Sequence, residues 1–221
     1  MNVIDALKQR KSVRSFLPKE VDSEKIKFIL EAAKHAPSGA NMQAFDVCVV
    51  SGDKKIEIEN RMLEAFDSDI VEKMDYQYYP KVWKDPYKSR RIKTGQELYK
   101  TIGIKRGEKE KRLAQWRENF KAFGAPTVLY FFIDSSLDTG SYMDYGMFLQ
   151  SVMLAATELE IATCPMVALA EFPSIVKEHL GVDDEKVLLC GIALGYEDTD
   201  ASINSYKTDR IELEEFTQFF E

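Results

Sequence analysis

The residues best suited to chemistry in this chain begin with a cluster of cations near its start. Arg10, Lys11 and Arg14 lie within five residues of one another, and Ser12 adds a hydroxyl group between them. Like charges this close repel, and an anion such as a phosphate relieves that repulsion through charge-assisted hydrogen bonds. The cluster therefore favours an anion site, although a solvated basic turn accounts for the same residues.

A second basic pair, Lys207 and Arg210, lies near the other end of the chain. From Glu197 onward there are eight acidic residues and only these two basic ones. An isolated pair of cations in an acidic segment favours a specific role over general solvation. The pair therefore strengthens the interpretation of the first cluster as a phosphate site.

Two further segments suit a ligand of another kind. The first runs from Pro37 through Ser38, Gly39 and Asn41 to Gln43, where small residues permit close approach and the amides match the edge of a heterocycle. A plain turn before a strand explains this loop equally well.

The other segment, Thr163–Leu169, is apolar, so a ligand there would meet main-chain amides, and a buried strand is the simpler interpretation.

Several classes of chemistry are disfavoured by composition. The chain has two histidines, His35 and His179, and both occur at positions typical of helix ends, which argues against a metal site and a Ser/His/Asp triad. No GxGxxG, GxxxxGK[ST] or GxSxG motif is present, so cationic side chains would have to hold any phosphate. We expect no metal, no catalytic side chain, and chemistry supplied by a cofactor.

Length and charge indicate one globular domain over residues 1–221. Apolar residues make up 45% and charged residues 30%, with a formal net charge of −7, which excludes disordered and collagen-like classes. No apolar run reaches the roughly 18 residues of a membrane span, and the first ten residues lack the apolar core of a signal peptide. We expect a cytoplasmic protein without membrane association, with its three cysteines as free thiols.

Helices and strands both recur along the chain, which predicts an α/β or α+β class with a central sheet. Helical spacing appears near the start and again after Asp22 or Ser23, which can cap the helix. A long, mostly apolar helix is expected over 142–159, and such a helix must be buried in a core or an interface. Strands are expected at 45–50, 127–133, 163–168 and 187–196, with 127–133 in the centre of the sheet, and a further helix at 56–66.

The segment 67–123 has an irregular, polar pattern and a concentration of positive charge. Residues 84–112 hold eleven Lys or Arg against four Asp or Glu. This charge would steer anionic acceptors or the phosphate of NADPH, while a solvated helical surface is the alternative. Aromatic side chains precede it at Tyr76, Tyr78, Tyr79 and Trp83, which suit either stacking on an aromatic acceptor or packing against a second copy.

Taken in order, these strings resemble the flavin-dependent nitroreductase family, nearest its nitrobenzoate-reductase-like branch. The matching strings are RKSVR from Arg10, APSGANMQ from Ala36, DYGMFLQSVMLAA from Asp144, TCP from Thr163, ALGY from Ala193 and NSYKTDR from Asn204. The chain departs from the family pattern at Ala44 and Phe45, where Pro-Trp is usual, and at Lys207, where arginine is common. The first departure would reshape the pocket, and neither removes a phosphate charge.

The resemblance implies an α+β sandwich with a central mixed, mainly antiparallel sheet flanked by helices. It also implies a homodimer with an FMN at each of two interface sites, a C-terminal extension that reaches the partner, and an acceptor site bordered by the variable segment 67–123.

By this similarity the cations and hydroxyl that hold the ribityl phosphate and nearby flavin oxygens are Arg10, Lys11, Ser12, Arg14, Lys207 and Arg210. The partner's loop would place Pro37, Ser38, Gly39 and Asn41 against the isoalloxazine ring, with Gln43 close by. The main chain of Pro165, Met166, Val167 and Ala168 would face flavin N5 and O4, with the Val167 amide as the N5 partner.

The activity implied is that of an NAD(P)H oxidoreductase that works by a ping-pong cycle. NADH or NADPH would reduce the flavin, and a small electron-poor aromatic such as a nitroarene or quinone would then reoxidise it. Arg14 or Lys11 would stabilise negative charge on the reduced flavin. The alternatives are a flavin store or redox sensor without turnover, and a dehalogenase or dehydrogenase on the same scaffold. A nucleic-acid protein is a third alternative, which the pI of about 5.1 and the lack of a docking motif oppose.

Overall fold

The computed structural model describes all residues from 1 to 221. Its four strands are β1 (Asp46–Ser51), β2 (Thr127–Asp134), β3 (Ala162–Met166) and β4 (Lys186–Gly195). Its α-helices are α1 (Val3–Gln9), α2 (Ser23–Ala33), α3 (Gly52–Asp67), α4 (Tyr87–Thr101), α5 (Lys109–Arg117), α6 (Thr139–Glu158) and α7 (Pro173–Leu180). Short 3₁₀ turns are η1 (Gly39–Asn41), η2 (Glu118–Gly124), η3 (Val167–Ala170), η4 (Ser202–Ser205) and η5 (Leu213–Glu215).

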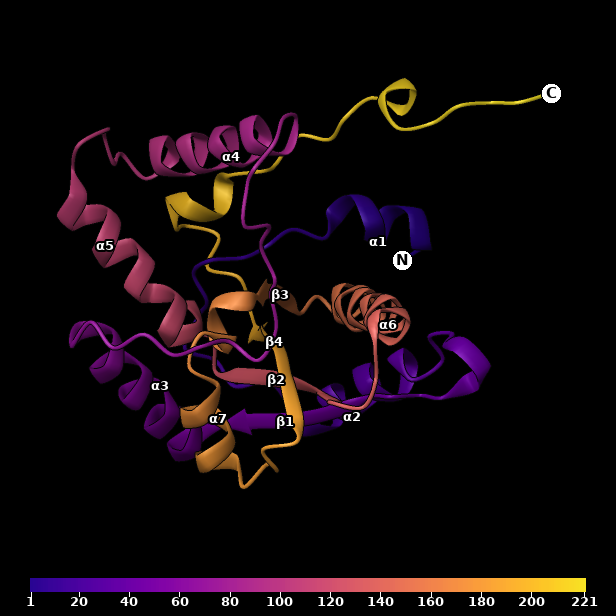
Figure 1. Cartoon of the computed structure of the whole chain (residues 1–221). Helices are drawn as coiled ribbons and strands as arrows, with labels where there is room; N and C mark the ends of the chain where they lie inside the picture. Colours follow the sequence, from indigo (N-terminus) through magenta and orange to yellow (C-terminus); the bar gives the residue numbers. More distant parts are fainter.

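The strands form one sheet in the order β1-β2-β4-β3, in which every neighbouring pair is antiparallel (Figure 1). Seven of the eight residues of β2 are buried, as expected for a strand covered on both faces. Alternate β2 side chains enter different cores, because successive residues of a strand point to opposite faces. Val128 and Tyr130 pack with α3 and α7, whereas Leu129 and Phe131 pack with α2 and α6.

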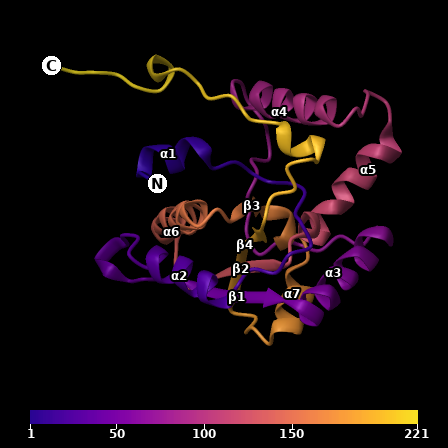
Figure 2. The same ribbon diagram turned by 180° about the vertical axis from the view of Figure 1, so that it is seen from behind.

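The molecule is therefore a sandwich of helices, sheet and helices, as Figures 1 and 2 show from opposite sides. This confirms the predicted α+β class and the helix-covered, mainly antiparallel sheet. The single parallel element is an isolated bridge between Ser12 and Thr163. The predicted cap of α2 is also present, since the Asp22 carboxylate accepts a hydrogen bond from the Glu24 amide at 2.9 Å.

The prediction of an irregular segment over 67–123 is wrong in one respect, because α4 and α5 form there. Neither helix has a buried residue, so neither carries the apolar periodicity from which a helix is recognised in a sequence. Both pack over one end of the molecule, away from α2 and α6 (Figures 1 and 2). The segment thus contains two ordered helices that the sequence pattern does not predict.

Close packing of η3 on the sheet depends on a glycine in β4. A Cβ added at Gly191 would lie 2.5 Å from the Leu169 side chain, a distance that nonbonded carbons do not adopt. The glycine therefore lets the turn that follows β3 lie directly against the sheet. This contact fixes the path of residues 165–168.

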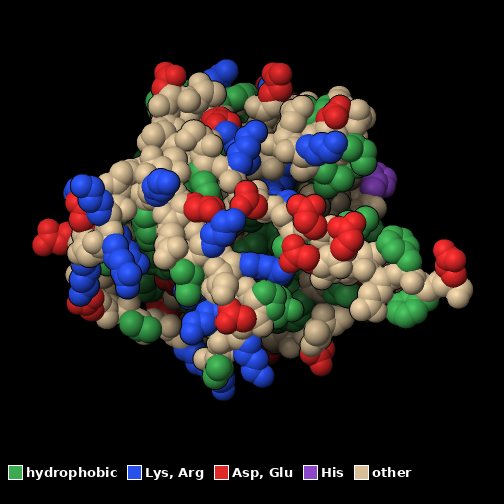
Figure 3. Space-filling model, turned by 90° about the horizontal axis from the view of Figure 1, so that it is seen from above, with side chains coloured by type: hydrophobic (Ala, Val, Ile, Leu, Met, Phe, Trp, Pro, Cys, Tyr) green, Lys and Arg blue, Asp and Glu red, His purple; other side chains and the backbone are tan.

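The C-terminal segment leaves the body of the protein and ends at a distance from it (Figures 1 and 2). Phe219 and Phe220 are more than four-fifths exposed, and Figure 3 shows apolar and acidic side chains along the projecting arm. A chain end that exposes two aromatic side chains lacks a binding surface within its own subunit. Across the fold, no helix combines the length and apolar character needed to cross a membrane.

Candidate functional site

The first basic cluster and the apolar segment at 163–168 are brought together at the edge of the sheet. The Val13 amide donates to the Thr163 carbonyl at 3.0 Å, and Ser12 forms the parallel bridge to the same residue. Val13 is buried, which holds the residues on either side of it against β3. Sequence segments about 150 residues apart thereby form one wall of a site.

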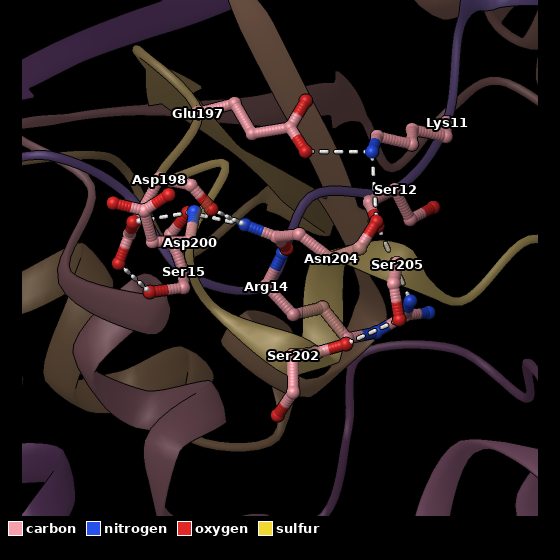
Figure 4. A network of polar contacts seen from close by, with 10 residues as sticks. All are labelled: Lys11, Ser12, Arg14, Ser15, Glu197, Asp198, Asp200, Ser202, Asn204 and Ser205. Carbon is pink, nitrogen blue, oxygen red and sulfur yellow. Dashed lines mark hydrogen bonds and ion pairs between the residues drawn. The ribbon is translucent and has the colours of Figure 1, made fainter. Parts of the chain in front are cut away.

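Asn204 joins the C-terminal segment to this wall, as Figure 4 shows. Asn204 is only 2% exposed, and its Oδ1 atom accepts a hydrogen bond from the Arg14 amide at 2.7 Å. Its Nδ2 atom donates to the carbonyls of Ser15 and Asp198, both at 2.8 Å. Both polar atoms of the amide side chain are hydrogen-bonded, so the loop before Lys207 is fixed to the Arg10–Arg14 segment.

Arg10 and Arg210 lie close together in this arrangement, and neither guanidinium is paired with a carboxylate. Burial, followed by the positive charge of Arg210, lowers the pKa of Arg10. The Arg210 guanidinium donates only to the Thr208 carbonyl and hydroxyl and to the Asp209 carbonyl. Two adjacent guanidinium groups without a counter-ion form a donor set suited to a phosphate.

Lys11 differs from the other predicted phosphate ligands. Its ammonium donates to the Asn204 carbonyl at 2.7 Å and pairs with the Glu197 carboxylate at 2.6 Å (Figure 4). The lysine thus has a counter-ion within the subunit, and its contact with a phosphate or flavin oxygen stays a prediction. Its contacts fix the Asn204 loop from a second side.

A cavity of about 1220 Å³ opens beside the wall formed by Arg14 and residues 164–168. Its opposite side consists of residues of α4, α5 and the loop between them. The cations that line it are Arg14, Arg91, Lys100, Lys105, Arg106 and Arg112, and the one acidic residue is Glu171. The cavity is thus strongly positive in a protein of net charge −7.

The segment 165–168 forms part of the cavity lining. Met166 and Ala168 are buried, whereas Pro165 is exposed and Val167 is half-buried. Cys164, beside Arg14, Ser12 and Arg10, is a thiol rather than a thiolate: burial raises its pKa to about 11 even though the nearby cations and the Ser12 hydroxyl act in the other direction. No side chain here has the properties of a nucleophile.

The loop Pro37–Gln43 lies elsewhere in the subunit. Ser38 is half-buried and Pro37, Gly39, Asn41 and Gln43 are exposed. The loop follows α2, on the side of the molecule away from α4 and α5 (Figures 1 and 2). Within one chain it therefore does not join the cavity.

The same loop has a strained backbone that is held by specific contacts. Ala40, Asn41 and Gln43 all have positive φ values, at 49°, 57° and 50°, which is costly for residues other than glycine. The Asp144 carboxylate accepts from the Gly39 amide at 2.9 Å, and the Ser38 hydroxyl accepts from the Gln43 amide at 3.0 Å. A strained and exposed turn fixed by two hydrogen bonds is typical of a binding loop.

The aromatic residues before α4 divide into two groups. The Tyr76 hydroxyl donates to the Leu189 carbonyl at 2.7 Å, so this tyrosine packs within the subunit. Tyr79 lines the cavity, and Trp83 lies under the Arg91 guanidinium, 4.9 Å from the ring centroid. Only the later part of this aromatic group therefore borders the cavity.

Sequence reasoning missed two residues that hold the site together, Asn204 and Asp144. Both begin a string that carries the family resemblance, and Asp144 is an acid within an otherwise apolar helix. A polar residue at a position expected to be buried is a signal for a hydrogen-bonding role. That signal was present in the sequence for Asp144, whereas Asn204 lies in a polar segment where burial was not expected.

A sandwich fold with a cationic donor set beside a large cavity defines a protein that binds an anionic ligand. A model described as "Nitroreductase family" matches residues 7–196, so the chain belongs to the nitroreductase family. The 4-nitrobenzoate reductase of Pseudomonas putida is 34% identical over 95% of this chain and 92% of its own length. The nitrobenzene nitroreductase of Ectopseudomonas oleovorans is 32% identical over 97% and 95%. The crystal structure of the FMN and NADPH-dependent nitroreductase NfnB from Sphigopyxis sp. strain HMH matches with a TM-score of 0.96, at 34% identity and full coverage of both chains.

Proposed function

We propose that this protein is an FMN-dependent NAD(P)H oxidoreductase of the nitroreductase type, which reduces nitroaromatic or quinone acceptors. The observation that carries the proposal is the unpaired Arg10 and Arg210 set beside the cavity wall of residues 164–168. Family membership and the FMN and NADPH dependence of the structural relative support the same conclusion. Bound FMN would supply hydride transfer between a reduced nicotinamide and the acceptor in a ping-pong cycle.

The donor set fits the phosphate end of FMN. Arg10 and Arg210 provide two guanidinium groups without counter-ions, and Ser12 provides a hydroxyl on the same segment. Lys207 is exposed three residues before Arg210 and adds a further charge. These groups would hold a dianionic phosphate by charge-assisted hydrogen bonds.

The cavity wall fits the ring end of the cofactor. Arg14 lines the cavity together with Pro165, Met166, Val167 and Ala168. Its guanidinium would stabilise negative charge on the pyrimidine side of the reduced flavin, and the Val167 amide would hydrogen-bond to N5. Because the remaining lining is largely apolar or main chain here, the wall also restricts water at the ring.

We infer that the active form is a homodimer in which a second copy supplies the loop Pro37–Gln43. This loop is strained, exposed and distant from the cavity of its own subunit (Figures 1 and 2). The C-terminal arm with exposed Phe219 and Phe220 provides a second element for contact with a partner. Light scattering of the purified protein should give the mass of two chains.

The phosphate assignment is tested by removing its two guanidinium groups. In the double variant Arg10→Ala and Arg210→Ala we expect the Kd for FMN to rise by at least about 100-fold, since a hydrogen bond to a charged group contributes about 1.5–3 kcal/mol. Lys54→Ala with Arg61→Ala removes two charges from exposed positions of α3 and is the matched control. Stoichiometric FMN in the double variant after dialysis would contradict the assignment.

Turnover is tested on the purified protein by its visible spectrum without oxygen. Addition of NADH or NADPH should bleach the flavin bands, and a nitroarene or quinone should restore them. Bound flavin that neither nucleotide bleaches would favour a store or sensor. A colourless protein that fails to take up added FMN would overturn the proposed function.

A further inference from the structure

The wall of the cavity opposite Arg14 carries a group of cations that no acidic residue neutralises. We call it the cationic wall, and it consists of Arg91, Lys100, Lys105, Arg106 and Arg112. None of these five side chains takes part in an ion pair within the protein. Such a concentration of positive charge around a cavity raises the local concentration of anions.

Three neighbouring cations that do not line the cavity are paired. Arg90 pairs with Glu215 at 3.2 Å and Lys93 with Asp209 at 2.6 Å, both on the C-terminal segment. Lys111, next to Arg112, pairs with Glu108 at 2.6 Å. Acidic residues thus pair with three cations outside the cavity and with none of the five that line it on this side. Figure 3 shows Lys and Arg side chains spread over this face of the molecule and the arm with acidic and apolar side chains projecting from one end.

Two guanidinium groups of the cationic wall are held in place by aromatic rings. Arg91 lies 4.9 Å from the Trp83 ring centroid and 5.8 Å from that of Tyr79, and Arg112 lies 5.1 Å from that of Tyr99. Stacking orients a guanidinium through its face and leaves the N–H groups at its edge free. These free edges match the two oxygens of a carboxylate.

We propose that the cationic wall selects acceptors whose aromatic ring carries a carboxylate, with Arg91 and Arg112 as the residues that determine this specificity. The proposal rests on the proposed function, because the acceptor must enter the cavity beside the flavin. The printed names of the relatives include both an anionic and a neutral nitroarene, nitrobenzoate and nitrobenzene. In this chain the unpaired cations favour the anionic class, since the protein's overall charge of −7 would otherwise repel it.

The test compares two acceptors that differ in charge, 4-nitrobenzoate and its methyl ester. In the holoenzyme, Arg91→Ala and Arg112→Ala should each lower kcat/KM for the acid on the order of tenfold, and should leave the value for the ester within about twofold. The matched controls are their paired neighbours, Arg90→Ala and Lys111→Ala, which remove a charge from the same helices outside the cavity. Both controls should retain the preference of the parent protein for the acid.

A binding measurement separates the proposal from turnover. Calorimetry on the holoenzyme should show tighter binding of unreactive benzoate than of benzamide, with a difference that Arg91→Ala and Arg112→Ala reduce and added salt weakens. Equal effects of the variants on acid and ester, or no effect on either, would overturn the proposal. So would an effect confined to the KM for NADPH, because the anion would then belong to the nucleotide. Failure of the parent protein to reduce both acceptors would instead count against the proposed function, while the benzoate comparison would still decide the proposal.

Discussion

The two walls of the cavity differ in how far their polar and charged groups are buried and paired. On the side of Arg14 and Asn204, buried polar groups are fully hydrogen-bonded and the main chain is fixed to the edge of the sheet. On the side of α4 and α5 no helical residue is buried and the cavity-facing cations have no carboxylate partner. The first wall has the properties of a rigid cofactor support, and the second those of an adaptable surface that sets specificity.

The difference predicts where a substitution will unfold the protein and where it will only change ligand preference. Removing a partner from the first wall leaves a buried donor or acceptor without a hydrogen bond, which lowers the free energy of unfolding. Removing a cation from the second wall exposes nothing that water cannot solvate. Stability should therefore respond to the first wall, and acceptor choice to the second.

The largest effect is expected from Asn204→Ala. The change removes three side-chain hydrogen bonds of 2.7–2.8 Å and leaves the Arg14 amide without a partner. The Ser15 and Asp198 carbonyls each keep one main-chain donor, the Asp198 amide at 3.1 Å and the Ala201 amide at 3.3 Å. We expect a loss of about 2–4 kcal/mol in the free energy of unfolding, measured by urea denaturation. FMN affinity should fall as well, because the Arg10–Arg14 segment loses its attachment to the C-terminal loop.

An exposed amide provides the control for this change. Gln77 donates to the Tyr79 carbonyl at 2.6 Å from an exposed position, so Gln77→Ala should leave stability close to that of the parent protein. Asn204→Asp should be at least as damaging as Asn204→Ala, because a carboxylate would face the two carbonyl oxygens that the amide now donates to. A stable Asn204→Asp protein would show that this wall is less rigid than its hydrogen bonds indicate.

The central strand and the basic cluster were the parts that the sequence predicted best, whereas Asn204, which fixes the first wall, was missed. The β2 strand was recognisable because its residues are apolar without interruption, and the cluster Arg10–Arg14 because its charges are adjacent in the chain. The cationic wall was visible only as an excess of positive charge. Which of its cations face the cavity depends on how α4 and α5 pack, and these helices have no apolar face from which packing can be inferred.

Lys11 shows a second limit of reasoning from sequence. Its position in the cluster predicts an anion contact, and in the fold its ammonium pairs with Glu197 at 2.6 Å. The partner lies 186 residues further along the chain, so no local pattern predicts the ion pair. Arg10 and Lys11 are neighbours in sequence but differ in their surroundings, because the fold brings an acid to only one of them.

A smaller, pH-dependent effect is expected from Glu171, the acidic residue on the cavity. Burial raises its pKa to about 7, above the value near 4.3 of an unfolded chain. Below about pH 4 the group is protonated in both states, so it has no effect on stability. As the pH rises from there to about 7, ionisation increasingly favours the unfolded state, and above pH 7 the full cost applies.

Glu171→Gln should therefore stabilise the protein by about 1–2 kcal/mol at pH 8, with allowance for partial solvent exposure, and by less at pH 5. Urea denaturation of both proteins at the two pH values measures the difference. Glu178→Gln, at an exposed position of α7, controls for the loss of one negative charge. A stabilisation equal at both pH values would show that burial of the carboxylate is not its cause.

The smallest effect is expected from the ion pairs on the outer side of α4. Lys93 and Asp209 lie 2.6 Å apart, but their side chains are 59% and 71% exposed, so water and salt compete with the contact. Lys93→Ala should leave the urea midpoint indistinguishable from that of the parent protein, and should increase amide exchange only in the C-terminal segment after Tyr206. A clear loss of global stability would mean that this segment helps to hold α4 against the body. The contrast between the two walls would then have to include the tail as a structural support of the second one, since exposed charges alone do not account for such a loss.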